Sequence, residues 1–107
     1  MIVVMTKFPI KKEYFKDFEE RAKSQFGEKG LTKQEGFIKM NILKPMLIPP
    51  NPENNLFIIE TYWKDLESFK KYTESPAFAE AHKNPPPQEW FTGRPTVDVF
   101  EVIKEKS

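Results

Sequence analysis

The chain has 107 residues and a nearly balanced charge, with 17 basic and 16 acidic side chains. This balance argues against a nucleic-acid-binding protein, because such proteins usually concentrate basic residues on one face. The absence of cysteine excludes disulfides, thiolate metal sites and cysteine nucleophiles. No apolar run approaches the roughly 20 residues of a membrane span, and the first residues do not resemble a signal peptide. We therefore expect one cytoplasmic domain over residues 1–107, with neither a membrane nor a nucleic acid as partner.

Four segments have the β-branched and aromatic composition that is typical of strands, at residues 1–8, 37–44, 56–63 and 96–103. Apolar side chains occupy both alternating sets of positions, as Val97 and Val99 against Phe100 and Val102 illustrate in the last segment. Both faces of the resulting sheet are therefore expected to be apolar. Pro9 is expected to end the first strand because it lacks a backbone N–H.

A first helix is predicted over residues 11–26, where Phe15, Phe18, Ala22 and Phe26 recur at helical spacing. Gly27 follows directly and is the expected C-cap. Residues 27–36 are polar and expected to be irregular, and two proline-rich loops are predicted over residues 45–55 and 83–95.

Two shorter helices are predicted between the third and fourth strands. Asp65 is a plausible N-cap for a helix through Thr73, whose inward residues would be Leu66, Phe69 and either Tyr72 or Thr73. Ser75 followed by Pro76 predicts a second start, because serine caps helices and proline favours their first position. This last helix would carry Phe78 and His82 on one face, since they are four residues apart.

The order β-α-β-β-α-α-β is that of a ferredoxin-like α+β fold whose second helix is divided in two. It predicts a four-stranded antiparallel sheet with the helices on one face. The other face would be left open and apolar, and a second copy of the chain is its simplest cover. We therefore predict a homodimer through the sheet face; the alternative is that the proline-rich loops fold over it.

His82 is the only histidine of the chain and the most informative single residue. A lone histidine on a helix is often structural or exposed to solvent. Here it lies one turn after Phe78, among small alanines and just before a loop that carries Trp90 and Phe91. These neighbours favour a hollow with aromatic walls, in which one imidazole could serve as an axial ligand of haem iron. The chain has no glycine-rich phosphate loop and no second histidine for a bare metal site.

The segments Phe57-Ile58-Ile59-Glu60-Thr61-Tyr62-Trp63 and Tyr72-Thr73-Glu74-Ser75-Pro76-Ala77-Phe78-Ala79-Glu80-Ala81-His82 resemble the antibiotic biosynthesis monooxygenase (ABM) superfamily. The chain is most similar to the branch of staphylococcal-type haem-degrading monooxygenases. The first strand, the Glu35-Gly36-Phe37 turn and the closing Val99-Phe100-Glu101-Val102 also fit, so the resemblance covers nearly the whole chain. It implies a dimeric α+β barrel.

Haem-degrading members of that family use a histidine as the proximal iron ligand, a tryptophan before it on the helix, and an asparagine near the end of the first strand. The resemblance places His82 at the ligand position, Tyr72 at the tryptophan position and Thr6 at the asparagine position. It implies that His82 ligates the haem iron and that Thr6 is the distal hydrogen-bond donor. Tyr72 would wall the cavity with Phe69 and Phe78, whereas Trp63 is expected to be core.

We interpret the chain as a small ABM-type monooxygenase that binds haem through His82, with haem cleavage by dioxygen and an external reductant as its activity. Two alternatives stay open. One is a cofactor-independent oxygenase acting on a phenolic or quinone-like substrate, in which His82 or Tyr72 transfers a proton. The other is a non-catalytic dimeric module that binds a small planar aromatic ligand.

Overall fold

The computed structural model describes residues 1–26 and 30–107, so the predicted cap at Gly27 lies outside the described residues. The strands are β1 (Ile2–Pro9), β2 (Phe37–Leu43), β3 (Leu56–Trp63) and β4 (Thr96–Glu101). The helices are α1 (Phe15–Gln25), α2 (Leu66–Thr73) and α3 (Pro76–Ala81), and short 3-10 turns cover Lys12–Tyr14, Leu31–Lys33 and Gln88–Trp90. Within the described residues, no helix has the length and apolar character needed to cross a membrane.

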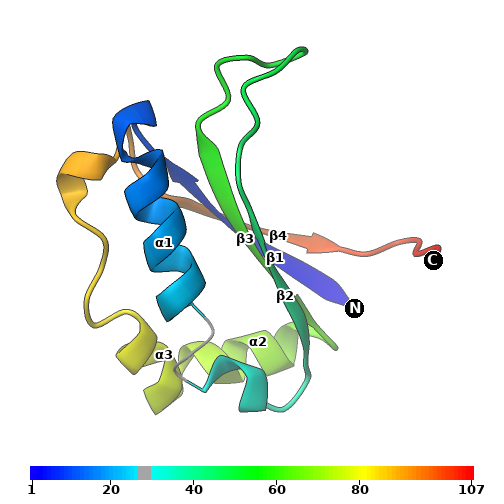
Figure 1. The fold of residues 1–107 in the computed structure, drawn as a ribbon. Helices are drawn as coiled ribbons and strands as arrows, with labels where there is room; N and C mark the ends of the chain where they lie inside the picture. The colour runs from blue at the N-terminus through cyan, green and yellow to red at the C-terminus, as the bar shows by residue number, and fades with distance from the viewer. Residues whose placement is uncertain (27–29) are drawn as a thin grey trace.

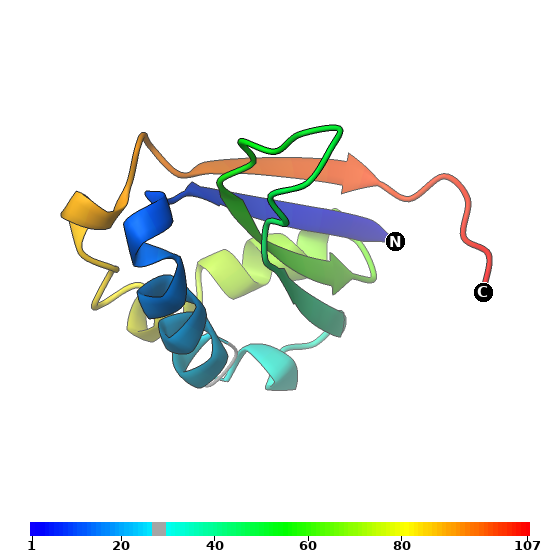
Figure 2. The same ribbon diagram turned by 45° about the horizontal axis from the view of Figure 1, so that its top comes forward.

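The strands form one antiparallel sheet in the order β2-β3-β1-β4, and the three helices lie on one side of it (Figures 1 and 2). This arrangement confirms the predicted ferredoxin-like α+β fold. The strand was expected to end before Pro9. Instead, Pro9 is the last residue of β1 and pairs with Leu56. Its carbonyl accepts a hydrogen bond from the Thr92 N–H at 2.9 Å, and the next residue, Ile10, donates its N–H to the Asn55 carbonyl at 2.9 Å.

Two buried clusters hold the helices against the sheet. One contains Val4, Leu31, Trp63 and Tyr72, and the other contains Ile10, Phe18, Ala22 and Phe57. Trp63 is 0% exposed, which confirms its predicted place in the core. Leu66 was expected to face inward but is 45% exposed. Leu66 and Tyr72 are six positions apart, which places their side chains about 120° apart around the helix axis. The two side chains therefore cannot share the buried face.

The sheet face opposite the helices is mixed, not uniformly apolar as predicted. Strand alternation and register place Leu43 and Phe100 on it, exposed by 40% and 46%. The same face carries the Lys7–Asp98 ion pair at 3.2 Å, and the Glu60 carboxylate, which accepts a hydrogen bond from the Asn41 side chain at 3.3 Å. The expectation was wrong because it considered only the apolar residues of each strand. Charged residues such as Lys7 and Asp98 occupy the same alternating set of positions and therefore lie on the same face.

Candidate functional site

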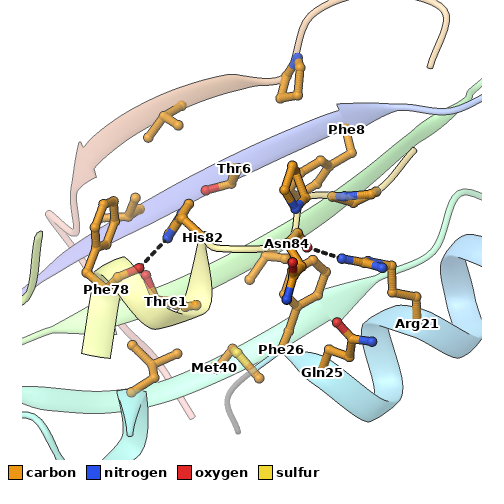
Figure 3. Close-up of a pocket in the computed structure, with 18 of the residues that line it drawn as sticks. Thr6, Phe8, Arg21, Gln25, Phe26, Met40, Thr61, Phe78, His82 and Asn84 are labelled. Atoms are coloured by element: carbon orange, nitrogen blue, oxygen red, sulfur yellow. Dashed lines mark hydrogen bonds between the residues drawn. The ribbon is translucent and has the colours of Figure 1, made fainter. Parts of the chain in front are cut away.

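A cavity of about 1190 Å³ opens between the helices and the helix-facing side of the sheet. This volume slightly exceeds the range typical of small-molecule sites, which is roughly 300–1000 Å³. Residues far apart in the chain surround it, as Figure 3 shows for Thr6, Arg21 and His82. The five residues to which the family resemblance assigns a role all line this one cavity: Thr6, Phe69, Tyr72, Phe78 and His82.

Local hydrogen bonds in α3 determine where His82 lies. The Ser75 hydroxyl accepts a hydrogen bond from the Phe78 N–H at 3.2 Å, and Pro76 occupies the first turn, as predicted. At the other end, His82 is the C-cap, and its N–H donates to the Phe78 carbonyl at 3.1 Å. A helix of only six residues thus has a defined start and a defined end, and its end delivers the imidazole to the cavity.

The His82 ring is held on two sides. Its Nδ1 lies 2.8 Å from the Phe78 carbonyl oxygen, and the two rings stack with centroids 4.0 Å apart (Figure 3). Because a carbonyl oxygen can only accept, Nδ1 carries the proton of the neutral imidazole. The lone pair therefore resides on Nε2, which no hydrogen bond within the described residues uses. An imidazole with one nitrogen oriented by a carbonyl and the other free is the usual arrangement of a histidine that binds metal.

A series of aromatic contacts continues from His82 into the core. Phe78 meets Tyr72 edge to face at 5.4 Å, and Tyr72 stacks on Trp63 at 5.3 Å. Burial raises the pKa of the Tyr72 hydroxyl above its ordinary value of 10.0, so this group is protonated at neutral pH. Tyr72 therefore contributes an aromatic ring with a neutral hydroxyl to the lining of the cavity.

Hydroxyl groups also line the sheet side of the cavity. Thr6 projects from β1 and Thr61 from β3, and both point toward the helices with Val4, which pairs with Thr61 in register. Thr61 was not singled out from the sequence. Its only signal there is the two-residue spacing to Trp63, which puts both side chains on one face of the strand.

Two arginines form a cationic part of the lining that the sequence analysis also missed. Arg21 and Arg94 both line the cavity, and they are the only arginines of the chain. The Arg21 guanidinium donates a hydrogen bond to the Asn84 carbonyl, whereas its Nε is buried and has no partner. An orphaned guanidinium donor beside a cavity suits a ligand that carries an anionic group.

The loop after α3 contributes one of its two large aromatic residues. Phe91 lines the cavity, but Trp90, which was expected to wall it as well, stacks on Tyr14 at 5.9 Å. In the part of the chain that the structure describes, no group of three or more histidine, cysteine, aspartate or glutamate side chains is placed to hold a metal ion.

Comparison with known proteins agrees with this fold. The profile of the family described as antibiotic biosynthesis monooxygenase (ABM) matches residues 1–84. The chain belongs to the ABM family. A staphylobilin-producing haem oxygenase of Staphylococcus haemolyticus is 31% identical over 85 residues, which are 78% of this chain and 75% of that protein.

Solved structures extend the ABM likeness over the whole chain. A structure of MhuD, a haem degrader of Mycobacterium tuberculosis with two haems in its active site, superposes with a TM-score of 0.76 at 20% identity, covering 100% of both chains. A mutant of SnoaB, a cofactor-independent oxygenase of Streptomyces nogalater, gives 0.61 at 15% identity, covering 97% of this chain and 94% of that one. At these identities both matches establish the ABM fold alone.

Proposed function

We propose that this ABM protein binds haem through His82 and degrades it with dioxygen and an external reductant. The observation that carries the proposal is the cavity-lining His82 imidazole, whose Nδ1 is fixed by the Phe78 carbonyl while Nε2 has no hydrogen-bond partner among the described residues. The 31% identity to a haem oxygenase supports the same conclusion.

The residues around the cavity fit a haem group in three respects. The cavity is large, the walls of Phe69, Tyr72 and Phe78 are aromatic, and the orphaned Arg21 Nε offers a donor to an anion. Haem is a planar macrocycle with two carboxylates, so Arg21 and Arg94 are suitable partners for its charged edge. Bound haem would supply the iron that activates dioxygen.

Each side chain then has a definite task in the proposed activity. His82 would hold the iron, and the aromatic walls would exclude water from the planar ligand. The Thr6 hydroxyl donates a hydrogen bond on the sheet side of the cavity. Tyr72 would contribute a neutral hydroxyl. The tryptophan that haem-degrading members of the family have at this position would instead offer an indole N–H.

Titration with haemin tests the proposal. We expect a shift of the Soret band for the wild-type chain, loss of that shift in His82→Ala, and its return when imidazole is added to the variant. Lys83→Ala, which removes an exposed neighbour, is the matched control and should bind like the wild type. An identical Soret shift in the wild type and in His82→Ala would contradict ligation by His82. Ascorbate and dioxygen should then bleach the complex, whereas a spectrally stable complex would indicate binding without turnover.

One observation favours a second candidate, a cofactor-independent oxygenase for phenolic or quinone-like substrates. The cavity holds both a free imidazole nitrogen on His82 and the protonated hydroxyl of Tyr72, which together could move a proton to or from such a substrate. Oxygen uptake with a quinol in the absence of any metal would support this candidate over haem degradation.

We further propose that two copies associate through the mixed sheet face. The exposed side chains of Leu43 and Phe100 would be covered there. The polar groups of this face would not prevent association, because Lys7 and Asp98 already pair with each other and Glu60 already accepts a hydrogen bond. The arginines, His82 and the cavity lie on the opposite side of the sheet and remain accessible.

A further inference from the structure

We propose that Thr61 is a second hydrogen-bond donor at the cavity, acting with Thr6 on the small ligand of the haem iron, and that Trp63 orients it. The inference rests on the proposed function, since it assigns a residue to the same site. It starts from the hydrogen bond between the Trp63 indole and the Thr61 hydroxyl oxygen, which is 2.9 Å long.

The direction of this bond is unambiguous. An indole Nε1–H can only donate, so the Thr61 oxygen is the acceptor. Trp63 is fully buried and packed between the rings of Phe69 and Tyr72, so the indole keeps a constant position. Thr61 therefore has one lone pair occupied by a rigid donor, and its hydroxyl proton must point elsewhere.

That proton has no acceptor among the described residues, where no hydrogen bond has Thr61 as donor. Thr61 lines the cavity, as does Thr6, and in register Thr61 pairs with Val4, two residues from Thr6 along β1. Residues related in this way on one sheet face are diagonal neighbours, about 7–8 Å apart. The two side chains thus lie on adjacent strands, on the same sheet face and at the same cavity, so both can donate toward one region of it.

A pair of threonine donors suits a small, electron-rich acceptor better than an extended apolar surface. Hydrogen bonds to charged acceptors are stronger than those to neutral ones, so the affinity of a small anion for the iron should depend on these two hydroxyls. The indole bond also polarises the Thr61 hydroxyl, because hydrogen bonds in a chain strengthen one another. Trp63 is accordingly a positioning residue that acts through Thr61 and does not itself reach the ligand.

Fluoride binding to the ferric haem complex tests the inference, with visible absorbance as the readout. Thr61→Val keeps the shape of the side chain and removes the donor, so we expect the Kd of fluoride to rise about tenfold, the loss typical of one hydrogen bond to a charged acceptor. Thr61→Ser retains the hydroxyl and should stay near the wild type. Thr73→Val is the matched control, because Thr73 also lines the cavity but its hydroxyl already donates to the Lys70 carbonyl at 2.7 Å.

The outcomes separate this inference from the proposed function. A normal, His82-dependent haemin complex whose fluoride affinity is unchanged by Thr61→Val would overturn the inference alone. An equal loss in Thr61→Ser would overturn it too, because the hydroxyl would then not be responsible. Absence of any haemin complex in the wild type would overturn the proposed function and this inference with it. Thermal unfolding of each variant checks that the Trp63 indole, deprived of its acceptor in Thr61→Val, still lies in a folded core.

Discussion

Substitution of Ser75 by alanine should damage both stability and ligand binding, because one hydroxyl controls the start of α3. The Ser75 Oγ accepts from the Phe78 N–H at 3.2 Å and donates to the Tyr72 carbonyl at 2.6 Å. Loss of an N-cap hydroxyl typically costs about 1 kcal/mol, and loss of the second hydrogen bond brings the total to about 1–2 kcal/mol. For a domain of this size, Tm should fall by about 4–12 °C.

The same substitution should weaken haemin binding, by up to about tenfold, because the Phe78 carbonyl that orients His82 belongs to this helix. A six-residue helix has little stability of its own and frays when its cap is removed. Thermal denaturation followed by circular dichroism and a haemin titration measure the two effects. Ser75→Thr retains donor and acceptor and is the control. The reasoning is refuted if Ser75→Ala melts and binds like the wild type, or if Ser75→Thr is equally impaired.

Two further predictions concern the sheet face and the aromatic wall. Phe100→Glu places a charge on the proposed interface and should convert dimers into monomers in light scattering, whereas Lys104→Glu should not; a wild-type chain that is already monomeric would contradict the interface. Burial raises the pKa of Tyr72 in the folded state, so the neutral Tyr72 hydroxyl makes its full contribution to the free energy of unfolding below about pH 10, where the unfolded tyrosine ionises. This contribution is lost as the pH rises through the raised pKa of the folded state. Tyr72→Phe should therefore make the alkaline fall in the urea midpoint shallower, and an unchanged pH profile would argue against a buried hydroxyl.

Features of this fold that depend on neighbours in sequence were predictable. Asp65 caps α2 by accepting from the Ser68 N–H at 2.9 Å, and Ser75 caps α3, because a serine or aspartate hydrogen-bonds to the backbone three residues later whatever the rest of the chain does. The contact between His82 and the Phe78 carbonyl is equally local, since the two residues are four apart. Hence the part of the site on α3 was accessible from the sequence.

The rest of the site depends on distances that no local pattern encodes. Arg21 reaches the cavity from α1 and donates to Asn84, which is 63 residues away in the chain, while Arg94 comes from the loop before β4. Thr61 had a visible partner in Trp63, but its importance depends on Thr6 being on the neighbouring strand, which only the register establishes. The mixed character of the open sheet face, by contrast, was predictable from the parity of Lys7 and Asp98 within their own strands, and the register adds only that the two side chains lie close enough to pair.

The exposure of His82 agrees with a role as a ligand. His82 is an exposed residue, and exposure of a lone histidine usually indicates a solvated side chain. A solvated imidazole, however, has no reason to hold one tautomer, whereas this ring is stacked on Phe78 and has Nδ1 engaged by a backbone carbonyl. Because Nδ1 is engaged, Nε2 is the nitrogen that remains for a ligating role, and a ligating residue must be accessible before the incoming group covers it. Fixed orientation together with an open edge is therefore what a proximal ligand requires, and neither property alone would support the assignment.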